Sequence, residues 1–126
     1  MKKRILLVDD EPSVREVVCT RLMSLGFEVL TAKDGQEGLD LARKESPDVV
    51  LLDLMLPKLD GYKVCRMLKF DKAFENIPVV IFSAKGSDAD KKLAEQAGAD
   101  AYMVKPFDFK LFTQTIQKLA GKLPQD

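Results

Sequence analysis

Short apolar runs alternate with segments of helical periodicity five times along this chain of 126 residues. Each run is bounded by turn residues and is too short for a buried helix, which is typical of strands. Strands that alternate with helices lie parallel in one sheet, because each crossover is right-handed and carries a helix back over a face of the sheet. The alternation therefore predicts a doubly wound α/β fold, and the length suits one domain.

The predicted strands cover residues 4–8, 27–31, 49–52, 77–82 and 101–104. Predicted helices cover about 12–26, 34–45, 60–70, 87–98 and 108–119. Pro12 suits a first helical turn, and Asp34 with Glu37 resembles a capping box. Valines and leucines recur at helical spacing in the first helix, and the buried stripe predicted for the last helix consists of Phe109, Phe112, Ile116 and Leu119.

Composition excludes several classes of function. Lys+Arg and Asp+Glu both number 20, so the zero formal charge argues against a nucleic-acid binder that relies on a basic surface. Histidine is absent, which removes Ser-His and Cys-His catalysis and most zinc chemistry. Cys19 and Cys65 lack metal-ligand spacing and are predicted to be apolar filler. No apolar run has membrane-spanning length, and acids follow the N-terminus too closely for a signal peptide, so we expect a cytoplasmic protein.

Charged and hydroxyl side chains stand where the predicted strands end. In a sheet of order 2-1-3-4-5, the ends of strands one, three, four and five are neighbours, and ligands bind beyond such ends. The residues predicted to converge there are Asp9 and Asp10 after the first strand, Asp53 after the third, Ser83 after the fourth and Lys105 after the fifth.

This constellation favours phosphoryl chemistry. Two carboxylates 4 Å apart repel by about 4 kcal/mol at an effective dielectric of 20, and a hard divalent cation such as Mg²⁺ relieves that repulsion. Calcium stays open as the ion, although the ligands are few and no EF-hand loop is present. Asp53 can act as a nucleophile toward phosphorus, with Lys105 supplying charge and Ser83 a hydrogen bond. The alternative is that these acids are helix caps and Lys105 forms a surface ion pair.

The motifs Asp9-Asp10, Asp53 with Pro57 and Gly61 following, Ser83-Ala84 and Lys105-Pro106 resemble the receiver domain of two-component response regulators of the chemotaxis-regulator type. The resemblance runs from Lys3 to about Leu119. It implies a flavodoxin-like doubly wound (βα)5 sandwich with a parallel five-stranded sheet of order 2-1-3-4-5. We expect the receiver domain to occupy residues 1–121 and a tail to occupy 122–126.

The resemblance also implies a regulatory phosphoacceptor rather than an enzyme that turns over external substrates. Asp53 would accept a phosphoryl group from a histidine kinase or phosphotransfer protein, and Lys105 would assist. Mg²⁺ would be held by the side chains of Asp10 and Asp53 and by the Met55 carbonyl, with Asp9 acting mainly through a metal-bound water.

The switch is implied in the same way. Ser83 would be the switch hydroxyl and Tyr102 the switch aromatic, although Tyr102 could instead be an edge-strand tyrosine that packs on the last helix. The downstream protein would bind the face formed by the fourth helix, the fifth strand and the fifth helix, at about 91–117. A cis bond is implied between Lys105 and Pro106.

Some features depart from the family's variants. Met55 and Lys85 lie where the family tunes the rate at which the aspartyl phosphate is hydrolysed. This pair of residues does not predict a lifetime for the phosphorylated state. The stretch 112–117 lacks the basic residue common in regulators that dimerise through the last helix, so we expect a monomer or weak dimer. No output domain follows, so we expect output through another protein, without direct contact to nucleic acid or membrane, unless the chain is an excised receiver.

Two other functions compete with this interpretation. A metal-dependent phosphohydrolase with an aspartate nucleophile usually carries a second acid two residues later, where this chain has Met55. A flavin or nucleotide binder of the same fold needs a phosphate-binding loop after the first strand. The sequence there is Asp9-Asp10-Glu11-Pro12, which repels phosphate unless a metal intervenes.

Overall fold

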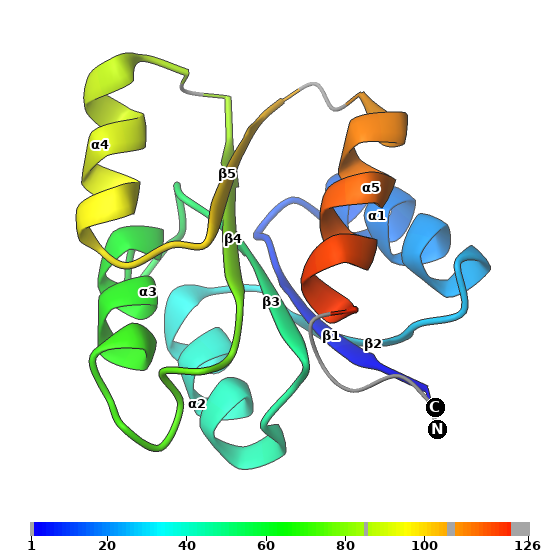
Figure 1. The fold of residues 1–126 in the computed structure, drawn as a ribbon, viewed down its shortest axis with the longest axis horizontal. Coiled ribbons are helices and arrows are strands. Elements are labelled where there is room, and N and C mark those ends of the chain that lie inside the picture. The colour runs from blue at the N-terminus through cyan, green and yellow to red at the C-terminus, as the bar shows by residue number, and fades with distance from the viewer. Residues whose placement is uncertain (1, 85, 106–107, 122–126) are drawn as a thin grey trace.

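The computed structural model describes residues 2–84, 86–105 and 108–121. Its strands are β1 (Arg4–Val8), β2 (Glu28–Ala32), β3 (Val49–Asp53), β4 (Val79–Ser83) and β5 (Ala101–Val104). They alternate with helices α1 (Pro12–Ser24), α2 (Gly35–Glu45), α3 (Gly61–Lys69), α4 (Asp88–Gln96) and α5 (Phe109–Ala120). All strand pairs are parallel and follow the order β2-β1-β3-β4-β5, which confirms the predicted doubly wound sheet (Figure 1).

The sheet separates two layers of helices. Helices α1 and α5 cover one face, and α2, α3 and α4 cover the other (Figure 1). Successive side chains of a strand point to opposite faces, so each central strand feeds both cores. The α1/α5 core contains Ile5, Leu7, Val49, Leu51, Val80 and Phe82, whereas the α2/α3/α4 core contains Leu6, Val8, Val50, Leu52, Val79 and Ile81.

The same alternation directs the strand ends. Asp9 and Asp53 follow residues of the α2/α3/α4 core, so their side chains lie on the α1/α5 face. Ser83 follows Phe82 and therefore lies on the opposite face. The acids and the serine thus share one edge of the sheet but approach it from different sides.

Element boundaries differ slightly from the predictions. The fourth strand begins at Val79 rather than Ile77, because Pro78 has no N–H for the ladder, although its carbonyl accepts from Val50 N at 2.9 Å. The helix predicted near Asp60 begins at Gly61, and Asp60 is its N-cap.

The cap at α2 also differs from the prediction in one detail. Asp34 accepts a hydrogen bond from Glu37 N at 2.8 Å, as a capping box requires. The Glu37 carboxylate, however, accepts from Lys33 N at 2.9 Å rather than from the N–H of the cap residue.

Burial follows the predicted stripe in α5 more closely than the valine-rich pattern of α1. Phe112, Ile116 and Leu119 are buried, while Phe109 is only partly buried. Of the α1 residues, Val18 and Leu22 are buried, whereas Val17 is 55% exposed.

An ion pair joins the last residue of α3 to Asp100, just before β5 and away from the acidic edge. Lys69 Nζ donates to Asp100 Oδ2 and to the Ile77 carbonyl, both at 3.0 Å. Asp100 Oδ2 also accepts from Val79 N at 2.8 Å.

Within the residues that the structure describes, no helix has the length and apolar character needed to cross a membrane.

Candidate functional site

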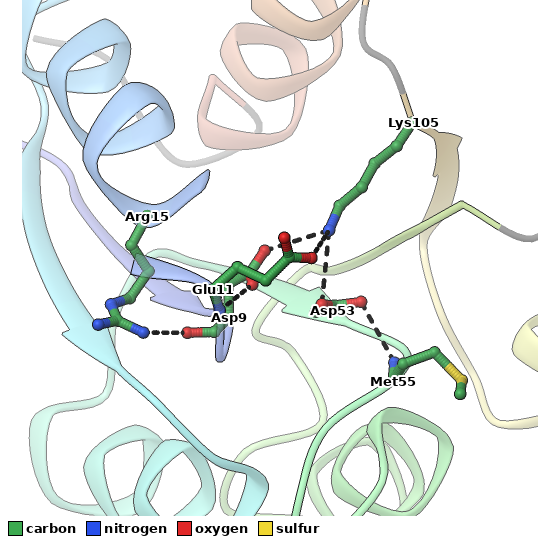
Figure 2. Close-up of polar contacts among 6 residues, drawn as sticks. All are labelled: Asp9, Glu11, Arg15, Asp53, Met55 and Lys105. Carbon is green, nitrogen blue, oxygen red and sulfur yellow. Dashed lines mark hydrogen bonds and ion pairs between the residues drawn. The ribbon is translucent and has the colours of Figure 1, made fainter. Parts of the chain in front are cut away.

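Asp9 and Asp53 lie side by side at the carboxyl ends of β1 and β3 and share one lysine. Their exposed fractions are 0% and 4%, so both carboxylates are almost fully withdrawn from water. Lys105 Nζ lies 3.3 Å from Asp9 Oδ2 and 3.5 Å from Asp53 Oδ2 (Figure 2). Among the residues that the structure describes, the two buried acids therefore face one ammonium, with Glu11 Oε1 a further 4.0 Å contact at the surface. The structure thus brings Asp9, Asp53 and Lys105 together as predicted.

The Asp9 side chain is oriented by its own turn. Its Oδ1 accepts a hydrogen bond from Glu11 N at 2.8 Å, which leaves Oδ2 directed at Lys105. The Asp9 carbonyl accepts from the Arg15 guanidinium at 2.6 Å, which joins this turn to α1 (Figure 2). Both contacts tie Asp9 to the residues that lead into α1 and form its first turn.

Asp53 ionises less readily than an ordinary aspartate. Burial raises its pKa to about 6, Lys105 opposes that rise, and the neighbouring Asp9 charge adds to it. The Met55 N–H donates to Asp53 Oδ1 at 3.2 Å and also favours the charged form. Within the described ranges, Lys105 thus compensates the charge of the two acids only in part, so the site favours an additional cation.

The donor set fits a hard divalent cation. One carboxylate oxygen from each of Asp9, Asp10, Glu11 and Asp53 lies within 4.8 Å of the others. Oxygen-only ligation, with exposed acids that leave room for water, matches the preference of Mg²⁺. Glu11 is a member of this cluster that was not predicted as a site residue, although the run of three consecutive acids was a signal for it.

Helix α3 begins directly against the backbone at Asp53. A Cβ atom on Gly61 would lie 2.5 Å from the Asp53 carbonyl oxygen and 2.8 Å from Leu54 Cα. Gly61 N also donates to the Leu54 carbonyl at 3.0 Å. Only glycine permits this approach, so the position of the acid depends on the residue that opens the next helix.

The loop between β3 and α3 is also docked on the start of α2. Gly35 N donates to the Pro57 carbonyl at 3.3 Å, and a Cβ on Gly35 would collide with the Leu59 carbonyl. Lys58 has a φ of 68°, and Leu59 N donates to the Pro57 carbonyl at 2.8 Å, which together form a strained γ-turn. The ammonium of Lys58 lies 3.6 Å from Asp34 Oδ2. These contacts tie the segment that follows Asp53 to the start of α2.

Ser83 and Tyr102 meet on the other face of the sheet. Ser83 is 1% exposed, and Tyr102 packs partly buried against the α2/α3/α4 core. Burial raises the pKa of Tyr102, a side-chain hydrogen bond with Ser83 opposes that rise, and the Asp90 charge adds to it. Tyr102 packs against the α2/α3/α4 core, and the alternative expectation had placed it on the last helix.

Three predictions concern positions outside the described residues. These are the cis bond at Lys105-Pro106, the role of Lys85 and the tail 122–126. Met55 lies inside the described range, and its side chain is 57% exposed.

Comparison with known proteins agrees with this fold. The response regulator receiver domain family matches residues 5–117. A probable transcriptional regulator ycf27 of Cyanophora paradoxa is 46% identical over 118 residues, which cover 94% of this chain and 48% of that protein. The chain spans about half the length of the curated relatives it matches.

Solved structures show the same architecture. The receiver domain of the Francisella response regulator 1452 has a TM-score of 0.90 at 29% identity, with 98% of this chain and 100% of that chain covered. The receiver domain of sensor histidine kinase PA1611 of Pseudomonas aeruginosa PAO1 has a TM-score of 0.88 at 30% identity, with 96% and 99% covered. That structure holds a magnesium ion coordinated in its active-site cleft. Because the family match covers most of the chain and the sheet order and acidic edge agree with it, the protein belongs to the response regulator receiver domain family.

Proposed function

We propose that Asp53 accepts a phosphoryl group from a phosphohistidine on a sensor kinase or phosphotransfer protein, in a reaction that requires Mg²⁺. One observation carries this proposal: in the described part of the chain, the buried carboxylates of Asp9 and Asp53 both contact Lys105. The pKa of Asp53 is about 6. At neutral pH most Asp53 carboxylates are ionised, so the nucleophile needs no separate base.

The transfer is a displacement at phosphorus. An Asp53 carboxylate oxygen forms a bond to phosphorus while the bond between phosphorus and the donor's imidazole nitrogen breaks, and that nitrogen keeps the electron pair. Negative charge spreads over the phosphoryl oxygens in the transition state. Lys105, with Nζ 3.5 Å from Asp53 Oδ2, is close enough to neutralise part of that charge. In this role the chain processes only its own acyl phosphate and acts as a regulator.

The proposed metal ligands are the side chains of Asp10 and Asp53 and the Met55 carbonyl, with Asp9 acting through a water. The ion would neutralise phosphoryl charge that Lys105 alone leaves uncompensated. The oxygen-only cluster supports this assignment, as does the turn in which Met55 N contacts Asp53. Gly61 and Gly35 contribute by holding the loop that carries Met55.

The proposed output starts at Ser83. A phosphoryl group on Asp53 would draw the Ser83 hydroxyl away from Tyr102, and Tyr102 would then move into the space vacated by Ser83 and its loop. Both states pre-exist in this account, and phosphorylation shifts their balance. A complete shift from 1:99 to 99:1 needs about 5.5 kcal/mol, so we expect a partial one.

The proposed partner surface is the face of α4, β5 and α5, at about 91–117. A groove of about 430 Å³ on this face is lined by Tyr102, Val104 and Leu111 among others, and Val104 and Leu111 are exposed. Because the relative ycf27 is a probable transcriptional regulator about twice as long, we propose that this face controls transcription through protein contacts. The zero net charge supports a receiver that does not itself bind nucleic acid. The lack of a basic residue in 112–117 supports a monomer or weak dimer.

Intact-mass spectrometry tests the acceptor. Acetyl phosphate with Mg²⁺ should add one base-labile phosphoryl group to the parent, none to Asp53→Ala, and none to the parent in EDTA. Asp88→Ala, a change at an exposed acid of α4, is the matched control and should label like the parent. An undiminished adduct on Asp53→Ala would reject Asp53 as the acceptor.

Output is tested separately through Ser83→Ala. This variant should still accept the phosphoryl group at Asp53 but should transmit the resulting conformational change poorly. Amide NMR shifts around Tyr102, recorded with and without a beryllofluoride phosphoryl mimic, measure the transmission. Shift changes equal to those of the parent would show that the signal does not pass through the Ser83 hydroxyl.

A further inference from the structure

Lys105 contacts an aromatic ring in addition to its acids. Its Nζ lies 4.9 Å from the centroid of the Phe82 ring, within the range of a cation–π interaction. Phe82 is the penultimate residue of β4 and is 1% exposed. In the sheet register Phe82 is the direct partner of Asp53 on β3, so both side chains project from the same face.

The ring and the two acids surround the ammonium. Asp9 Oδ2 and Asp53 Oδ2 accept from it at 3.3 and 3.5 Å, while the Phe82 ring presents a π face. The Lys105 side chain is 18% exposed, so the ring replaces water on one side of the charge. An ammonium is more strongly attracted to an aromatic face when it is partly desolvated.

The three contacts respond differently to phosphorylation. Once Asp53 carries a phosphoryl group, its carboxylate loses most of its charge, and Lys105 must turn toward a phosphoryl oxygen. Phe82 is 1% exposed and has only two side-chain torsions, so we expect its ring to stay in place. The attraction between a charge and a ring face varies gently with lateral position, unlike a directional hydrogen bond.

We propose that Phe82 is a positioning residue for phosphoryl transfer. Its ring keeps the Lys105 ammonium beside the reacting carboxylate while the ammonium exchanges a carboxylate oxygen for a phosphoryl oxygen. The inference rests on the proposed phosphoacceptor function. A leucine at this position would fill much of the volume but would not attract the charge, and Lys105 would then be free to move toward exposed Glu11.

The kinetic test compares two phenylalanines of one core cluster. Phe82→Leu should slow phosphorylation by acetyl phosphate and Mg²⁺ about fivefold at saturating donor, the size of a partly desolvated cation–π contact. Phe112→Leu makes the same chemical change at a ring that stacks edge-on against Phe109, 5.8 Å away, and should phosphorylate at the parental rate. Both rates are measured at a temperature where circular dichroism shows the variants folded. Equal rates for the two variants would overturn the proposal.

A double-mutant cycle provides a readout that does not depend on phosphorylation. The loss of stability caused by Phe82→Leu is measured by urea unfolding in the parent and in a Lys105→Met background, without metal. Phe82→Leu should lower the folding equilibrium constant by a factor about five times larger when Lys105 is present than in the Lys105→Met background. Equal losses in the two backgrounds would show that Phe82 only fills the core.

The two arms separate this inference from the proposed function. If the parent does not label at all, the phosphoacceptor function fails while the cycle still tests the contact. If the parent labels but the cycle shows no coupling, the positioning role alone fails. Phe82→Met, which retains more volume, replaces the leucine variant if the latter is unfolded at the assay temperature.

Discussion

Replacing Asp53 by asparagine should stabilise the metal-free protein at neutral pH. The pKa of this carboxyl rises from 3.8 to about 6 on folding, chiefly because burial disfavours its charge. Each pKa unit corresponds to about 1.4 kcal/mol, so keeping Asp53 ionised in the fold costs at most about 3 kcal/mol. A neutral side chain of the same shape removes that cost.

Asparagine does not recover the whole amount. The Asp53 carboxylate accepts from Met55 N at 3.2 Å and from Lys105 Nζ at 3.5 Å, but an amide has only one oxygen to offer. One of these donors would face the amide nitrogen, and such a lost hydrogen bond costs about 1–2 kcal/mol. We therefore expect a net gain of about 1.5 kcal/mol, which for a domain of this size raises the melting temperature by about 6 °C.

The pH dependence has a definite sign. Because the folded pKa of Asp53 exceeds the unfolded value, the folded state binds more protons between about pH 4 and pH 6. The favourable contribution of protonated Asp53 is complete below about pH 4 and is lost as the pH rises through about 6. Because this pH-dependent contribution of at most about 3 kcal/mol exceeds the net gain of about 1.5 kcal/mol, the advantage of Asp53→Asn should be lost and slightly reversed near pH 4, and should reach its full size near pH 7.5.

Urea unfolding of metal-stripped protein at pH 4 and pH 7.5 measures this difference. Asp88→Asn is the control, because Asp88 is exposed in the first turn of α4 and should lose only a few tenths of a kcal/mol through the helix dipole. Mg²⁺ at a hundredfold excess over its dissociation constant should stabilise the parent by about 2.7 kcal/mol and the variant by less. An asparagine variant less stable than the parent at pH 7.5, or an advantage equal at both pH values, would refute the reasoning.

Three further substitutions or measurements test other parts of the structure. Gly61→Ala places a Cβ 2.5 Å from the Asp53 carbonyl, so it should cost about 2 kcal/mol in urea unfolding and slow acetyl phosphate labelling; parental values for both would contradict the close approach. Burial raises the pKa of Cys65 to about 12, so iodoacetamide at pH 8 should alkylate this thiol no faster than the protein unfolds. Rapid labelling of Cys65 in the folded state would count against its burial. Lys69→Met removes the 3.0 Å pair with Asp100 and should cost about 1–2 kcal/mol while leaving phosphorylation unchanged, so slower labelling would show that the far edge of the sheet also affects the acidic site.

Much of the fold was predictable because its signals are local. The alternation of strand and helix depends on periodicity and on caps within a few residues, and the caps at Asp34, Asp60, Ser87 and Asp108 all accept from backbone N–H groups of their own helices. The starts of β4 and α3 were shifted by one or two residues. Such shifts arise because a proline or a glycine at the boundary decides which residue first makes a regular hydrogen bond.

The convergence of Asp9, Asp53 and Lys105 was also predictable, because parallel strands bring their carboxyl ends to one edge regardless of the residues between them. Glu11 was not predicted to belong to the acidic cluster at this edge. Its contact with Lys105 depends on the turn in which Glu11 N bonds Asp9, and no period in the sequence encodes that geometry.

The sequence by itself thus determined the order of elements, the sheet and the residue types at the reactive edge. Only the tertiary structure decided what holds those residues in place. Two examples are the contact of Lys105 with the Phe82 ring and the close approach of Gly35 to Leu59. In each, the two residues belong to segments far apart along the chain. Lys105 meets Asp9 across a separation of 96 residues. Contacts at that range are set by how the helices pack on the sheet, because local backbone preferences fix the direction of each element but not the distance between side chains on different elements.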